Sequence, residues 1–132
     1  MDTVDIQKRI RQWVESRLGN AAMEPHERGM RSLEENIELG QSVGVTREEA
    51  HRLVNHVFDK KPGYTSQELG GAALTLLACA DGCGYLLSEC ALAELHRIEQ
   101  SPREKFSKRQ TENAANGIGE LPVPNPTESG AR

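Results

Sequence analysis

Aromatic residues are scarce in this 132-residue sequence, where they make up 4% of the chain. The β-branched residues are scattered and do not alternate with polar ones, so a β-sheet would have little material for its apolar faces. Apolar residues instead recur at intervals of three and four, which is the spacing of amphipathic helices. A chain of this length suffices for one domain with one core. The sequence therefore predicts an all-α protein, a single-domain helical bundle of four to six helices.

The sequence also lacks an apolar run of about 18 residues, which a membrane-spanning helix needs. Its start, MDTVDIQKRI, has no apolar signal segment. The cysteines number 3, an odd count that argues against a disulfide framework. The formal net charge of -4 provides no global basic field for nucleic acid or anionic lipid. We therefore expect a cytoplasmic protein that does not associate with membranes and that its overall charge does not draw to nucleic acid, although a local basic patch is compatible with these counts.

Apolar stripes bounded by helix-start and helix-stop residues predict the individual helices. The stripes cover residues 6–18, 30–43, 50–58, 69–80 and 87–98. Thr46 with Glu49, and Thr65 with Glu68, have the spacing of capping boxes and predict helix starts. The 69–80 stripe, LGGAALTLLACA, is apolar nearly all round, so we expect it to be the central buried helix.

The last quarter of the chain has a different composition. Ser101 and Pro102 predict the N-cap and the first residue of a final helical segment that reaches about Gln110. Residues 113–132 are rich in Gly, Pro and Asn and have no periodic apolar face, so their burial cannot offset the entropy lost on ordering. We expect a helical domain over residues 1–112 and a disordered tail over 113–132.

Three glutamates, Glu34, Glu35 and Glu38, lie close together on the predicted 30–43 helix. Like charges three or four residues apart on a helix cost roughly 0.2–0.5 kcal/mol per pair unless a cation compensates them. Mg²⁺ is one candidate, because it takes hard oxygen ligands and keeps waters or phosphates in its shell, and Glu68 can supply a further carboxylate. The alternative is a solvated acidic face on which Arg31 pairs with Glu35, with Glu68 acting only as a cap.

Three segments, taken in order, carry a family resemblance: LEENIEL, then QELGGAALTLLACADGCGYLLSECALAEL, then REKFSKRQ. In this order they resemble the MazG-like all-α nucleoside triphosphate pyrophosphohydrolases over about residues 10–110. Glu34, Glu35 and Glu38 match the EExxE motif of that family in full. Glu68 matches the first position of its ExxD motif, whereas Gly71 stands where the family has Asp.

The resemblance implies a metal-dependent hydrolase that cleaves a nucleoside or deoxynucleoside triphosphate to the monophosphate and pyrophosphate. It implies Mg²⁺, or Mn²⁺ in its place, bound by Glu35, Glu38 and Glu68. It also implies a catalytic role for Glu34 and Glu38, with Glu34 as an outer acceptor or a water-orienting base.

A basic stretch near the end of the family domain corresponds here to Lys105, Lys108 and Arg109, which the resemblance implies hold the substrate phosphates. A solvated final helix is the alternative for these three residues. The resemblance further implies a homodimer or a higher homo-oligomer. Gly70 and Gly71 fit that expectation, since small residues let a neighbouring helix approach closely.

Gly71 also supports a different interpretation, because it removes one carboxylate from the metal site that the family uses. The alternative function is a noncatalytic helical interaction or regulatory protein that keeps the fold and has lost part of the metal site. A third candidate is a nucleic-acid-associated regulator that uses the basic stretch. Trp13 has two readings as well: packing in the core, or stacking on a nucleobase.

Overall fold

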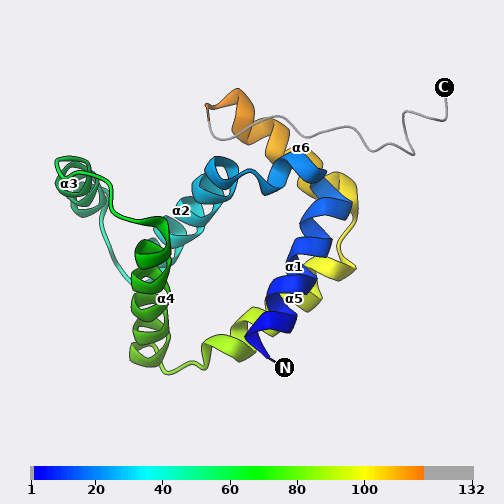
Figure 1. Cartoon of the computed structure of the whole chain (residues 1–132), viewed down its shortest axis with the longest axis horizontal. Helices are drawn as coiled ribbons and strands as arrows, with labels where there is room; N and C mark the ends of the chain where they lie inside the picture. The colour runs from blue at the N-terminus through cyan, green and yellow to red at the C-terminus, as the bar shows by residue number, and fades with distance from the viewer. Residues whose placement is uncertain (1, 118–132) are drawn as a thin grey trace. The chain divides into compact units, whose positions relative to one another are not determined.

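A computed structural model describes residues 2–117 of the chain, and these residues form helices and no strands (Figure 1). The fold class is therefore all-α, as predicted. The elements follow one another as α1 (Thr3–Leu18), the short 3₁₀ helix η1 (Asn20–Met23), α2 (Pro25–Ser42), α3 (Arg47–Phe58), α4 (Thr65–Gly82), α5 (Leu87–Gln100) and α6 (Arg103–Ala115).

The chain divides into two compact units. Unit 1 is the described part of Met1–Asn36 and Leu95–Arg132, and unit 2 is Ile37–Glu94. Two helices run from one unit into the other: α2 passes the boundary after Asn36, and α5 passes it before Leu95.

Unit 1 has a small apolar core formed by α1 and η1. Its buried residues and the partly buried side chains packed against them are Val14, Leu18, Ala22, Ile10, Trp13 and Met23. The turn that brings η1 back against α1 is made by Gly19, whose φ of 88° lies in the left-handed region that favours glycine. Its amide donates to the Glu15 carbonyl at 3.2 Å, which closes α1 where the sequence predicted.

Polar contacts attach α1 to the end of α5 within unit 1. The indole Nε1 of Trp13 donates to the Ile98 carbonyl at 3.2 Å. The guanidinium of Arg9 pairs with the Glu99 carboxylate at 2.5 Å, and Nη2 of Arg17 donates to the Glu99 carbonyl at 3.4 Å. Trp13 is thus a packing residue: its ring packs, partly buried, against the core, and its indole N–H has a backbone acceptor.

Local sequence signals place several helix boundaries correctly. In α3 both halves of the predicted capping box form: Thr46 Oγ1 accepts from the Glu49 amide at 3.2 Å, and Glu49 Oε1 accepts from the Thr46 amide at 3.0 Å. The Thr46 amide, and the Thr46 hydroxyl that also donates to Glu49 Oε1 at 3.0 Å, hold the pKa of the Glu49 carboxyl below its ordinary value. Gly44, with φ of 94°, follows the end of α2 as expected.

Three predicted helix starts were wrong in detail. Helix α2 begins at Pro25, five residues before the apolar stripe that predicted it, and proline suits this first helical position. The N-cap of α4 is Tyr64, so Thr65 is already helical and makes no capping box with Glu68. Pro102 is the N-cap of α6 rather than its first residue, and the Ser101 hydroxyl instead donates back to the Arg97 carbonyl at 3.0 Å. Each shift is one residue or a few, within the freedom that caps leave.

Helix α6 continues to Ala115, so residues 113–115 are helical, beyond the predicted boundary at 112. Residues 118–132 of the predicted tail lie outside the described part of the chain.

The expectation that α4 is buried was wrong. None of its residues is buried, and Leu69 and Leu74 are 66% and 70% exposed. The same holds across unit 2, which contributes thirteen of the fifteen large hydrophobic residues found exposed in the described chain. Composition makes α4 apolar, but burial requires a second surface, and the described residues of unit 2 provide none for it.

Among the described residues, no single helix is both long and apolar enough to cross a membrane, although α4 and α5 taken together as a bent pair meet that criterion.

Candidate functional site

The acidic motif lies on α2, as the sequence predicted. Glu34 and Glu38 are one turn apart, and Glu35 and Glu38 are separated by three residues on the same helix. Glu35 and Glu38 are exposed, whereas the side chain of Glu34 is only 23% exposed. The three acids therefore differ in environment despite their proximity.

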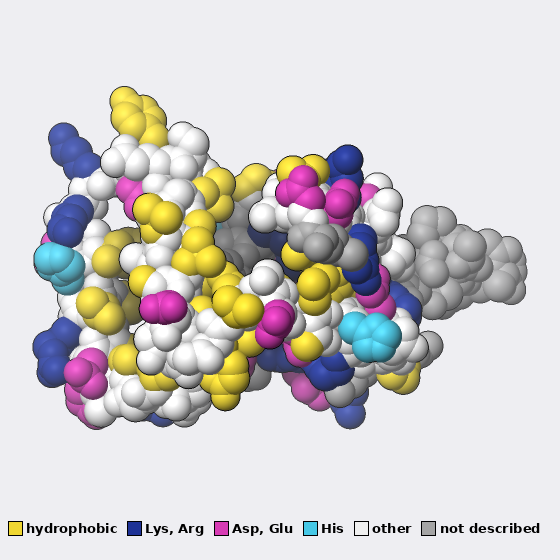
Figure 2. Space-filling view, turned by 90° about the horizontal axis from the view of Figure 1, so that it is seen from below, with side chains coloured by type: hydrophobic (Ala, Val, Ile, Leu, Met, Phe, Trp, Pro, Cys, Tyr) yellow, Lys and Arg dark blue, Asp and Glu magenta, His cyan; other side chains and the backbone are white. Residues whose placement is uncertain are grey.

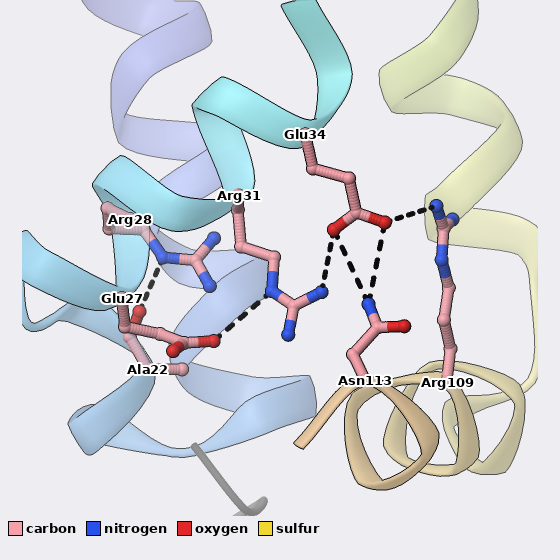
Figure 3. Close-up of polar contacts among 7 residues, drawn as sticks. All are labelled: Ala22, Glu27, Arg28, Arg31, Glu34, Arg109 and Asn113. Carbon is pink, nitrogen blue, oxygen red and sulfur yellow. Dashed lines mark hydrogen bonds and ion pairs between the residues drawn. The ribbon is translucent and has the colours of Figure 1, made fainter. Parts of the chain in front are cut away.

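Glu34 lies at the junction of α2 and α6 in unit 1 (Figure 3). Its Oε2 accepts from Arg31 Nη1 at 3.0 Å, and its Oε1 lies 3.6 Å from Arg109 Nη2. The amide nitrogen of Asn113 donates to both carboxylate oxygens, at 3.5 and 3.4 Å. Two cations and an amide thus compensate the charge of Glu34, which makes it a link between two helices.

Arg31 in turn connects Glu34 to a buried carboxylate. Glu27 is 1% exposed, and its Oε1 accepts from Arg31 Nε at 3.2 Å (Figure 3). Arg31 therefore pairs with Glu27 and Glu34, where the sequence-based alternative paired it with Glu35. Sequence reasoning overlooked Glu27. Its signal was present, because Glu27, Arg31 and Glu34 stand at i, i+4 and i+7 on one helical face.

Glu68 lies in the first turn of α4 and its side chain folds back over Gly63. A Cβ atom at Gly63 would collide with the Glu68 carboxylate, which means that the carboxylate covers that glycine. The backbone amide of Glu68 donates to the Tyr64 carbonyl at 3.0 Å.

Within the described residues, no three His, Cys, Asp or Glu side chains come together as a metal cage. The donor chemistry of Glu35 and Glu38 nevertheless fits Mg²⁺. Proteins usually hold this ion through one or two carboxylates, and waters and substrate phosphates complete the octahedron. Two glutamates three residues apart on an exposed helical face meet that requirement.

Gly71 lies one turn after Glu68 on α4, and a Cβ atom built on it meets nothing within 4 Å. The same is true of Gly70. Neither glycine is required by a close helix contact among the described residues, and an aspartate fits sterically at either position.

The basic segment lies on α6. Arg109 reaches Glu34 of the acidic motif, so the structure brings one predicted phosphate-binding residue to one predicted catalytic residue. Lys108 is exposed, and the side chain of Lys105 lies outside the described part of the structure. The side chain of Arg109 is 51% exposed while it pairs with Glu34.

The cysteines are free thiols, as expected. Local desolvation and the neighbouring Cys79 raise the pKa of the Cys83 thiol. This favours the neutral thiol over the thiolate. Cys83 and Cys90 are exposed, and Cys79 is partly buried.

No protein-family model, curated protein or solved structure shows a significant match to the chain. The MazG-like resemblance therefore depends on the motifs alone.

The Glu34 link predicts a stability effect. Glu34→Gln removes the charge that compensates Arg31 and Arg109, and we expect it to lower the free energy of unfolding by about 1–3 kcal/mol. Glu35→Gln, on the exposed face of the same helix, is the matched control and should change it by less than about 0.5 kcal/mol. Urea denaturation followed by circular dichroism measures both. Equal stabilities of the two variants would show that Glu34 does not hold α6.

Proposed function

We propose that this protein is a metal-dependent nucleotide pyrophosphohydrolase that cleaves a nucleoside or deoxynucleoside triphosphate to the monophosphate and pyrophosphate. The observation that carries the proposal is the contact between the complete EExxE motif and the basic segment, through Glu34 and Arg109. Hydrolysis of a triphosphate needs both charges side by side: carboxylates for a divalent cation and cations for phosphate oxygens.

Glu35 and Glu38 are the proposed ligands of Mg²⁺ or Mn²⁺, with Glu68 as a third. The bound ion would neutralise charge on the phosphates and help to orient them. The role proposed for each glutamate of EExxE follows from its environment. Because Glu34 already accepts from Arg31 and Asn113, it suits a positioning role for Arg109 better than the role of a water-orienting base.

Arg109 and Lys108 are the proposed contacts for the β and γ phosphates, together with Lys105. A guanidinium held by a carboxylate keeps its planar fork oriented and loses less entropy when it binds a phosphate. The Glu34 contact thus supports a preorganised Arg109.

A noncatalytic interaction protein is the second candidate, and two observations favour it. Gly71 replaces the family aspartate, and no cage of three acidic, histidine or cysteine side chains forms among the described residues. In that case the exposed apolar residues of unit 2 are the functional surface. Activity measurements separate the two candidates.

We also propose that the protein is a homodimer or a higher homo-oligomer. Figure 2 shows hydrophobic side chains at many places on the surface, and thirteen of the fifteen exposed large hydrophobic residues in the described chain belong to unit 2. Monomeric soluble proteins rarely expose contiguous apolar patches beyond a few hundred Å². A second copy is the simplest cover, because a twofold axis lets the same apolar face of α4 serve on both sides.

The first activity prediction concerns Glu38. Glu38→Gln keeps the shape of the side chain and removes its charge, so pyrophosphate release from a panel of triphosphates with Mg²⁺ or Mn²⁺ should fall at least a hundredfold. Glu48→Gln, an acid in the first turn of α3, is the control and should retain activity. Release of orthophosphate instead of pyrophosphate would contradict the reaction, and full activity of Glu38→Gln would contradict the assigned metal site.

The second prediction concerns the missing aspartate. Gly71→Asp adds a carboxylate one turn after Glu68, so Mg²⁺ should raise the melting temperature of this variant more than that of wild type. Gly70→Asp is a matched control, since both sites are sterically open and both glycines are helical. The side chain at position 70 projects about 100° around the helix from the side chain at position 71. Thermal melts with and without Mg²⁺ test the pair. Equal shifts in both variants would mean that Glu68 does not belong to the site.

The third prediction concerns assembly. Light scattering at micromolar concentration should give at least twice the chain mass of 14.6 kDa. Leu74→Glu places a charge on the exposed apolar face of α4 and should shift the protein toward monomer, whereas Lys60→Glu should not. A monomeric mass for wild type would contradict the proposed homo-oligomer.

A further inference from the structure

Unit 1 contains a pocket of about 380 Å³ that none of the proposed catalytic or metal-binding residues line. It lies along α1 and is bordered by residues of η1 and the start of α2. Its apolar lining comes from Val4, Ile10, Val14 and Met23, of which Val14 also belongs to the buried core. The volume falls in the range of small-molecule sites in proteins, about 300–1,000 Å³.

The charged groups lining this pocket are all cationic: Lys8, Arg11 and Arg28. Lys8 and Arg11 are one turn apart on α1, and Arg28 faces them from α2. Arg11 uses its Nε to pair with Glu15 at 2.8 Å, which leaves the two Nη groups of its fork. The pocket therefore combines an aliphatic wall with a concentration of positive charge.

Arg28 is the least solvated of the three cations. Its Nε donates to the Ala22 carbonyl at 2.5 Å, which fixes the guanidinium at the edge of the core (Figure 3). Burial lowers the pKa of Arg28, so its charge has lost hydration that an anionic ligand would replace. A fixed, partly dehydrated guanidinium binds an anion more strongly through its N–H donors than a fully solvated one does.

The lining also restricts the body of the ligand. The apolar side chains are aliphatic, and none is aromatic, so a flat nucleobase would find no stacking partner. We propose that this pocket binds an anionic amphiphile: a carboxylate or phosphate monoester held by Lys8, Arg11 and Arg28, with an aliphatic chain against Val4, Ile10, Val14 and Met23. The site is independent of the proposed hydrolysis, because it needs neither the divalent metal nor the glutamates.

Calorimetric titration of the full chain without divalent metal tests the ligand class. Octyl phosphate and octanoate, each below its micelle concentration, should bind, and comparing them identifies the preferred head group. Inorganic phosphate and octyl glucoside should bind at least tenfold more weakly, since each lacks one of the two required parts. Shortening the chain from eight carbons to six should weaken binding by up to about fourfold per methylene.

Two variants distinguish binding in this pocket from binding to the exposed apolar residues of unit 2. Lys8→Glu reverses one charge at an exposed position of α1 and should weaken octyl phosphate binding at least tenfold. Lys60→Glu makes the same change in the exposed segment after α3 and should leave binding unchanged. Circular dichroism spectra should match the wild type for both. Equal affinity for octyl glucoside and octyl phosphate, or an unchanged affinity in Lys8→Glu, would overturn the proposal.

Discussion

The buried carboxylate of Glu27 is the constraint on which the arrangement of unit 1 depends. A charged group that is 1% exposed is stable only when a partner compensates it, since an isolated buried charge costs several kcal/mol. Arg31 supplies the compensating positive charge, and the pairing with Glu27 holds its side chain in place. The same guanidinium also pairs with Glu34. Glu34 then holds α6 through Arg109 and Asn113. A single buried acid thus sets the position of a side chain some two turns away, and that side chain sets the position of another helix.

This series of ion pairs makes the three glutamates of the EExxE motif chemically different. In sequence the three glutamates are equivalent carboxylates on one helix. In the structure Glu34 is compensated by cations, and Glu35 and Glu38 lie on the exposed part of α2. A carboxylate already surrounded by donors has fewer lone pairs to offer a metal ion, so Glu34 is not among the proposed ligands. The proposed phosphate contact is instead the arginine that Glu34 orients.

The two units bury apolar surface to very different extents. Unit 1 packs Val14 and Leu18 against η1 and fastens α1 to the end of α5 with hydrogen bonds. Unit 2 has helices with well-formed ends, such as the Thr46 capping box, and yet its large apolar side chains stay exposed. Helix formation is a local matter of propensity and capping, whereas burial needs a second surface. The proposed second copy of the chain would provide that surface for α4.

The sequence by itself determined the all-α class, the approximate position of each helix and the location of EExxE on a helix, because caps, glycines and apolar spacing act over a few residues. Even the Glu27–Arg31–Glu34 spacing was readable, since it lies within one helix. Only the tertiary structure decided that Glu27 is buried, that Arg109 and Asn113 meet Glu34 across more than seventy residues, and that α4 is exposed. Those facts depend on which surfaces meet in space, and a pattern along one helix carries no information about the partner on the other side.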